Sequence, residues 1–172
     1  MADETDYRDF YDDEKYLLEA VGERFRQTGK IEPADFYMIL VWKANRAKNY
    51  HRDRLKDMAG SFRAAVENIA SQLSSSSEDK QRLQILLEKW GFALPTASAI
   101  LTILYPKDFT VYDGRVCKEV GRAYKNWLGW DEYEEFKKAV IANTPKDYCL
   151  RDKDKFLIGR STRNDIERDC AA

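Results

Sequence analysis

The sequence predicts an all-α protein, a bundle of about seven or eight helices in a single helical domain covering residues 1–172. Three observations lead to this fold class. Apolar residues recur at three- and four-residue steps along most of the chain, which is the period of an amphipathic helix. Glycine ends several of these segments and proline opens the next, as at Gly29 and Pro33 and again at Gly91 and Pro95. Hydrophobic residues make up 44% of the sequence, which is enough to bury a substantial core.

Each expected helix has its own signals of beginning and end. The first is acidic in its opening turns, which suits the positive end of a helix dipole. The second begins at Pro33 and is apolar nearly all round, so we expect a buried helix in preference to a short strand. A long third helix carries one apolar face from Leu55 to Leu73, and Ser77 caps the fourth. The expected helices lie at about residues 7–25, 33–42, 55–73, 77–90, 95–104, 113–124, 131–140 and 147–157, and the polar tail 161–172 is expected to fray.

The charge of the chain is nearly balanced, with 29 Lys and Arg residues against 30 Asp and Glu residues. This balance does not by itself indicate a nucleic-acid binder, but a local basic face can exist on such a protein. Residues 43–56 hold six basic side chains and one aspartate. They form either a solvated helix face or a surface for the DNA backbone. The candidate residues are Lys43, Arg46, Lys48, Arg52 and Arg54. His51, the only histidine, lies in this polar stretch and is expected to be exposed.

Nothing in the sequence indicates a membrane span, a signal peptide or a metal centre. There is no apolar run of about 18 residues, and the acidic N-terminus lacks the basic-then-apolar order of a signal peptide. Cys117, Cys149 and Cys170 are widely spaced, which fits reduced thiols and matches no zinc or iron–sulfur motif. We therefore expect a cytoplasmic protein without a metal or cofactor. The sequence does not indicate an oligomeric state.

Two segments within residues 83–120 carry the most specific pattern. In the first, a glycine turn, Gly91-Phe92-Ala93, joins two helices and leads into Pro95-Thr96-Ala97. The amides of such a turn and the N-terminus of the next helix can hold a phosphate. Glycine permits a positive φ and a close approach of the DNA backbone. The second segment is Val111-Tyr112-Asp113-Gly114-Arg115-Val116, in which an aspartate opens a helix.

In this order and spacing, residues 83–120 resemble the helix-hairpin-helix (HhH-GPD) DNA glycosylase superfamily, which includes endonuclease III and the adenine glycosylases. Those proteins carry a Gly-apolar-Gly hairpin, a Thr-Ala helix and then an aspartate; here Asp113 follows Pro95 by 18 positions. The chain is also similar to small bacterial members that share Trp42-Lys43 and an Arg-Asp-x-Asp pattern at Arg151–Asp154.

The resemblance implies a protein that binds double-stranded DNA with a flipped base and acts without a cofactor. It places the catalytic carboxylate at Asp113 and phosphate binding at the amides of Gly91, Phe92 and Ala93. We add Lys89 and Arg115, which flank the motif, as candidate phosphate contacts. Candidate aromatic residues for a base pocket are Trp42, Trp90 and Tyr112. Trp127 and Trp130 are instead expected to pack a helix–helix corner, and Cys117 to lie in the core.

The sequence departs from the superfamily pattern at two positions. Ala93 replaces the second hairpin glycine, which can alter the closest backbone approach. Pro95 stands where bifunctional members carry a Schiff-base lysine, so the lyase step by that route is excluded unless another lysine substitutes. The expectation is a monofunctional glycosylase, in which Asp113 stabilises the positive charge that develops on the deoxyribose.

Three interpretations follow from the sequence. The first is the monofunctional DNA glycosylase, acting on a modified or mismatched base. The second is a catalytically inactive module of the same fold that binds DNA or a protein partner. In the third, the turn at Gly91 only packs two helices, Asp113 is only a helix cap, and the protein does not meet DNA.

Overall fold

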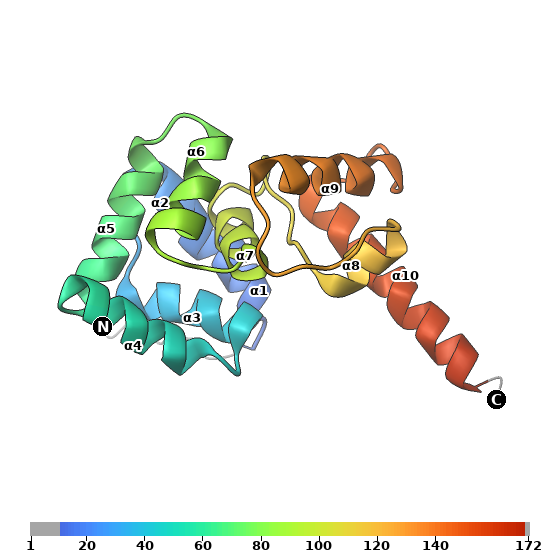
Figure 1. The fold of residues 1–172 in the computed structure, drawn as a ribbon, viewed down its shortest axis with the longest axis horizontal. Helices are drawn as coiled ribbons and strands as arrows, with labels where there is room; N and C mark the ends of the chain where they lie inside the picture. Colours follow the sequence, from blue (N-terminus) through green and yellow to red (C-terminus); the bar gives the residue numbers. More distant parts are fainter. Residues whose placement is uncertain (1–10, 171–172) are drawn as a thin grey trace, which may run out of the picture. The chain divides into compact units, whose positions relative to one another are not determined.

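The computed structural model describes residues 11–170, and every regular element among them is helical, as the sequence predicts (Figure 1). α1 (Asp13–Tyr16), the π-helical stretch η2 (Leu17–Gly22) and α2 (Glu23–Thr28) form one continuous helix. Next come α3 (Pro33–Ala44), α4 (Lys48–Ala59) and α5 (Phe62–Ser75). α6 (Asp79–Gln84) continues into a second π-helical stretch, η3 (Ile85–Lys89). The remaining helices are α7 (Leu94–Leu104), α8 (Gly114–Glu119), α9 (Trp130–Ala142) and α10 (Leu150–Cys170). The start of the first expected helix, before residue 11, lies outside the described residues.

The chain divides into two units, Met1–Ser76 and Ser77–Ala172, although the sequence predicts one domain and contains no obvious linker. In the first unit, α3, α4 and α5 pack against one another. In the second, α7 packs against α6 and η3, while α10 packs against α8 and α9. Every α7 residue except Pro95 is buried, so this helix supplies much of the second unit's interior.

The long helix expected around residues 55–73 is instead two helices, α4 and α5. Gly60 ends α4 with a φ of 81°, in the left-handed region that favours glycine. Ser61 then caps α5, because its hydroxyl accepts a hydrogen bond from the Ala64 amide at 3.0 Å. The Gly60-Ser61 pair thus ends one helix and begins the next. The apolar positions from Leu55 to Leu73 are therefore shared by two helices.

The C-terminal tail is helical through Cys170, which corrects the expectation that residues 161–172 fray; residues 171 and 172 lie outside the described part. Contacts with α8 support the second half of α10. Arg160 pairs with Glu119 at 2.7 Å, and the Arg115 guanidinium donates to the Thr162 hydroxyl at 3.1 Å. Because these partners lie far away in the sequence, the polar composition of the tail gives no sign of them.

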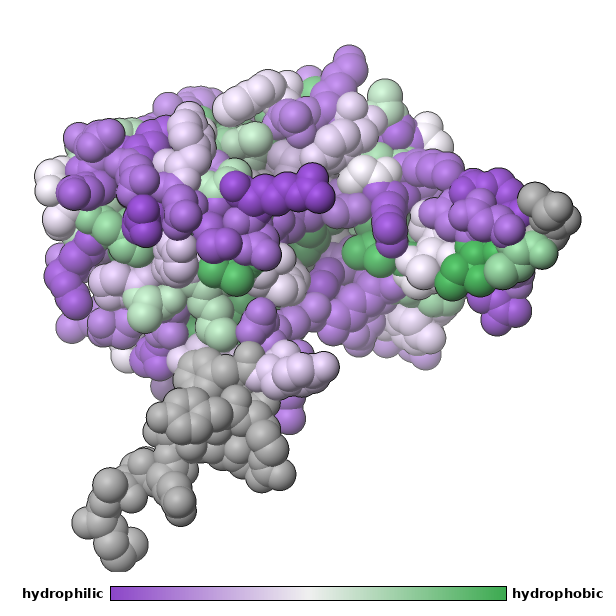
Figure 2. Space-filling view, turned by 90° about the horizontal axis from the view of Figure 1, so that it is seen from below, coloured by the Kyte–Doolittle hydropathy of each residue, from purple (hydrophilic) through white to green (hydrophobic). Residues whose placement is uncertain are grey.

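The described helices were compared with the length and hydropathy that a membrane span requires, and their side chains with the grouping that a metal site requires. None of them is long and apolar enough to cross a membrane. Hydrophilic side chains cover most of the face drawn in Figure 2, and apolar residues appear there as small separate patches. Within residues 11–170, no three His, Cys, Asp or Glu side chains are grouped so that they could hold a metal ion.

His51 is buried on α4, in contrast to the expected exposed position. The helical repeat explains the difference, because His51 precedes the fully buried Leu55 by four residues and shares its face. Burial lowers the pKa of the His51 imidazole, and the charge of Arg54 lowers this pKa further.

This burial predicts a specific pH dependence of stability. The folded-state pKa of His51 lies below its unfolded value of about 6.5, so its contribution is complete above that pH and is lost as the pH falls below it. We expect His51→Gln to lose less thermal stability than the wild type when both are taken from about pH 8 to pH 5. Parallel melting curves provide the measurement. An equal loss of thermal stability in the two proteins would show that the His51 imidazole does not cause this pH dependence.

Candidate functional site

The turn at Gly91 has the backbone geometry that its glycine predicts. The π-helical stretch η3 ends at Lys89, and the Phe92 amide donates to the Leu86 carbonyl at 2.9 Å. Gly91 has a φ of 61°, which L-amino acids with side chains rarely adopt. Ala93 then caps α7 in an extended conformation, and Pro95 lies in the first turn of the helix.

The amides of this turn differ in whether another described residue accepts from them. The Leu94 amide donates to the Asn126 carbonyl at 2.9 Å, and Pro95 has no N–H group. In the described part of the chain, the amides of Gly91 and Ala93 make no hydrogen bond. Gly91 is exposed, and Phe92 is fully buried and anchors the turn. A phosphate at this turn would therefore meet the amides on either side of Phe92.

Buried side chains hold the extended segment that leads to Asp113. The Tyr133 hydroxyl bonds both backbone groups of Thr110, at 2.9 Å each. The Asp154 carboxylate accepts from the Val111 amide and from the Thr110 hydroxyl, also at 2.9 Å. This segment has no helix or sheet partner, so these bonds satisfy backbone groups that would otherwise be buried without one.

Asp154 is fully buried, and its charge is compensated there. Beside its two bonds to the segment, it forms an ion pair and hydrogen bond with Arg151, which is also buried. A buried carboxylate is tolerated only when it is paired and hydrogen-bonded. The Arg-Asp-x-Asp pattern noted in the sequence is therefore part of the support behind Asp113.

The hairpin and Asp113 are connected through α7. The Ser98 hydroxyl accepts a hydrogen bond from the Tyr112 amide at 2.9 Å, immediately before Asp113. Ser98 lies on α7, the helix that begins at the Gly91 turn. The two segments singled out in the sequence are thus held together by a direct bond.

Asp113 is the N-cap of α8. Its Oδ1 accepts a hydrogen bond from the Arg115 amide at 2.9 Å, and the residue is half-buried. The cap bond engages one of the two carboxylate oxygens of Asp113. Capping and a catalytic role are therefore compatible.

The three aromatic candidates for a base pocket are divided between the two units of the chain. Trp42 lies on α3 in the first unit, whereas Trp90 and Tyr112 belong to the second. Trp90 is 5% exposed and Tyr112 is 2% exposed. The Tyr112 ring packs edge-on against Phe136, with centroids 4.8 Å apart. Burial raises the pKa of Tyr112 to about 12, so its hydroxyl stays neutral.

The candidate basic residues are also divided between the units. Lys89 lies exposed at the end of η3, and Arg115 is turned toward Thr162. Lys43, Arg46, Lys48, Arg52 and Arg54 all belong to the first unit. Several of them have neighbouring partners there: Lys48 donates to the Asn45 carbonyl at 3.1 Å, Arg52 pairs with Asp53 at 2.8 Å, and Arg54 donates to the Met58 sulfur at 3.4 Å.

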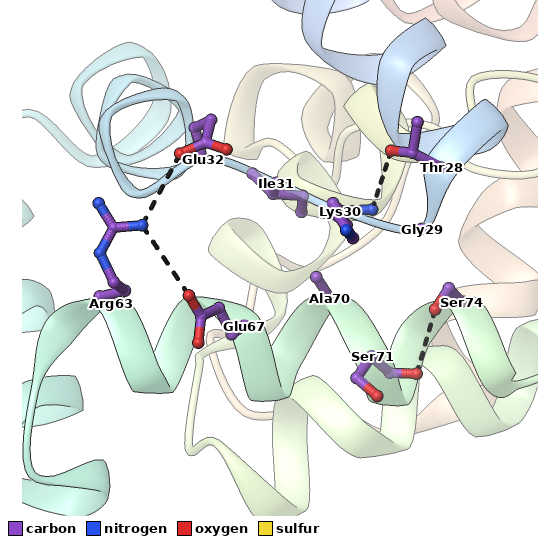
Figure 3. Close-up of a pocket in the computed structure, with 10 residues that line it drawn as sticks. All are labelled: Thr28, Gly29, Lys30, Ile31, Glu32, Arg63, Glu67, Ala70, Ser71 and Ser74. Atoms are coloured by element: carbon purple, nitrogen blue, oxygen red, sulfur yellow. Dashed lines mark hydrogen bonds and ion pairs between the residues drawn. The ribbon is translucent and has the colours of Figure 1, made fainter.

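A cavity in the first unit contains none of the predicted site residues. It measures about 540 Å³ and lies between the residues joining α2 to α3 and one side of α5. Figure 3 shows Arg63 reaching toward Glu32 and Glu67, and its Nη1 lies 3.9 Å from a carboxylate oxygen of each. Arg63, which lies at one end of the residues drawn in Figure 3, thus already has two partners. A second cavity, of about 300 Å³, lies beside Tyr112.

The cysteines offer no nucleophile at this site. Cys117 is buried on α8, as expected, and burial raises the pKa of its thiol, which keeps it protonated. Cys149 and Cys170 are exposed free thiols on or next to α10.

Sequence reasoning missed the residues that hold the site together. Ser98 interrupts the apolar run of α7, and a hydroxyl at such a buried position signals a hydrogen-bonding role. The Arg151–Asp154 pattern gives no sign of its role in the sequence, because the partners of Asp154 lie 43 and 44 positions earlier. The Tyr133 hydroxyl bonds Thr110, 23 positions earlier, and no local pattern indicates that partner.

Comparison of this chain with protein-family models, with curated proteins and with solved structures finds no match. The resemblance to the DNA glycosylases therefore rests on the residues of the sequence alone.

Proposed function

We propose that this chain is a DNA-binding protein of the base-excision glycosylase type, acting as a monofunctional DNA glycosylase on a modified or mismatched base. The main support is the bond between Ser98 and the Tyr112 amide, at 2.9 Å. It ties the helix that follows the Gly91 turn to the residue preceding Asp113. The turn that we propose to hold a phosphate and the Asp113 carboxylate therefore belong to one unit of the chain.

In the proposed reaction, the Gly91 and Ala93 amides bind a phosphate of the DNA backbone. The target nucleotide leaves the base stack, at a cost of about a few kcal/mol. The bond between C1′ of the deoxyribose and the base breaks, its electron pair leaves with the base, and the base takes up the proton that the attacking water gives up. Asp113 stabilises the positive charge on the sugar and orients the water that adds at C1′, as carboxylates do in glycoside hydrolysis. The products are a free base and an abasic site, and no cofactor takes part.

A second candidate, an inactive module that binds DNA or a protein, is favoured by two other observations. Pro95 removes the lysine nucleophile, and the Asn126 carbonyl occupies the Leu94 amide at the start of α7. This module would use the same hairpin for DNA. The two candidates therefore share a DNA-binding test and differ in base release.

The hairpin test compares Gly91→Ala with Gly60→Ala. Both glycines have positive φ, so alanine costs roughly 1–2 kcal/mol of folding stability at either position. A methyl group at Gly91 would also crowd an approaching phosphate. Loss of charge-assisted hydrogen bonds worth about 1.5–3 kcal/mol predicts roughly 10- to 150-fold weaker binding of a labelled duplex, measured by fluorescence anisotropy at low salt. Gly60→Ala should bind as the wild type does. If the two variants bind the duplex with equal affinity, the hairpin is not the phosphate-binding site. If the wild type does not bind duplex DNA, both candidate functions are excluded.

A further inference from the structure

The loop of residues 121–128, between α8 and α9, is fixed by its backbone to both parts of the proposed site. The Arg122 amide donates to the Cys117 carbonyl of α8 at 2.8 Å. The Lys125 amide donates to the Tyr112 hydroxyl at 3.1 Å, and the Asn126 carbonyl accepts from the Leu94 amide at 2.9 Å. The loop is therefore held beside the hairpin and beside the residue that precedes Asp113.

Two aromatic side chains of this loop face solvent. Trp127 is 71% exposed, which corrects the expectation that it packs a helix–helix corner. Tyr124 is 46% exposed, and its ring stacks on Tyr112 with centroids 5.5 Å apart. A Cβ at Gly114 would lie 3.6 Å from the Tyr124 ring, so this ring covers the start of α8, next to Asp113. Burial raises the pKa of Tyr124, and the charge of Asp113 raises it further.

Two cationic residues precede Trp127 on the loop. Arg122 and Lys125 line the cavity of about 300 Å³ beside Tyr112, together with Glu132. This volume is at the lower end of the range of small-ligand pockets, about 300–1,000 Å³. Proteins that bind unpaired nucleotides combine aromatic rings, on which the bases stack, with basic side chains that hold the neighbouring phosphates. An exposed indole and two basic residues on one loop match an extruded base and its phosphates.

On the basis of the proposed DNA binding, we propose that loop 121–128 contacts the bases: Trp127 stacks on an unpaired or extruded base, and Arg122 and Lys125 hold the adjacent phosphates. Stacking of this kind does not depend on base identity, because every base offers a π face. The loop thus adds affinity for a disturbed base pair, while Asp113 would carry the chemistry.

The test measures binding of a fluorescein-labelled duplex with one central mismatch, by anisotropy over a series of salt concentrations. Trp127→Ala should bind roughly 5- to 150-fold more weakly, with an unchanged salt dependence. Trp127→Phe keeps a ring and should retain most of the affinity. Lys125→Gln should reduce the salt slope by about one, because one phosphate contact is lost. Tyr11→Ala, at a ring that is 93% exposed in the first unit, is the matched control and should bind as the wild type does.

The outcomes separate this inference from the proposed function. If Trp127→Ala binds as tightly as the wild type while Gly91→Ala binds weakly, the hairpin still binds phosphate, but the proposal that loop 121–128 contacts the bases is wrong. If Trp127→Ala and Trp127→Phe lose affinity equally, stacking is excluded. If the wild type does not bind the duplex at low salt, both proposals fail. Since Trp127 is exposed, circular dichroism and melting of its variants should match the wild type.

Discussion

Replacing Asp154 by alanine should destabilise this protein more than any other single change considered above. The substitution removes the partner of the buried Arg151 and the acceptor of the Val111 amide and the Thr110 hydroxyl. Loss of one partner of a buried ion pair costs roughly 3–5 kcal/mol, because the other charge stays buried without compensation. We expect a loss of that size in the free energy of unfolding, measured by urea denaturation.

Two further variants make this prediction specific. Asp152→Ala removes an exposed neighbouring carboxylate, which accepts a hydrogen bond from the Cys149 thiol at 3.1 Å, and it should cost much less. Asp154→Asn keeps an acceptor for Val111 but leaves Arg151 without its counter-charge, so its stability should lie between the wild type and Asp154→Ala. In both Asp154 variants, hydrogen exchange at the Val111 amide should accelerate. An Asp154→Ala protein as stable as Asp152→Ala would show that the buried pair does not hold the segment.

The local parts of the site were predictable from the sequence, because they depend on local chemistry. Gly91 predicted a positive φ, Asp113 predicted a helix start, and the apolar period of α7 predicted a buried helix. The all-α fold class follows from the same period and is confirmed in the described residues.

The remaining features depend on contacts between residues distant in the sequence. Asp154 bonds a segment 43 and 44 positions earlier, and nothing in its own neighbourhood names that partner. From the sequence, Trp127 is expected to pack against helix ends, because a large aromatic side chain is usually buried to a high degree. In the structure it lies on the loop between α8 and α9 and is 71% exposed. The division into two units follows from the pattern of contacts, and the serine run at its boundary is too short to indicate it.

The second large effect concerns chemistry: Asp113→Asn should lower the rate of base release by about 10²- to 10⁴-fold. Asparagine caps a helix about as well as aspartate, so the bond to the Arg115 amide and the start of α8 should persist. What is lost is the negative charge that stabilises the sugar cation and orients water. Stability and duplex binding should therefore change little while release is nearly abolished.

The matched control is Asp12→Asn, which makes the same change at another helix cap. Asp12 caps α1, and its Oδ1 accepts from the Lys15 amide at 3.1 Å. This aspartate belongs to the first unit and has no part in the proposed chemistry. A comparable loss of release in both variants would point to a general effect of removing a capping charge.

The proposed enzyme is tested most directly by single-turnover base release from a panel of duplexes that carry modified or mismatched bases, scored as abasic sites. If Asp113 is the catalytic carboxylate, the wild type and Asp12→Asn should release at least one of these bases at the same rate. Asp113→Asn should bind the same duplex without releasing the base. A wild type that binds the duplexes and produces no abasic site from any of them would contradict the proposal that this protein is a DNA glycosylase.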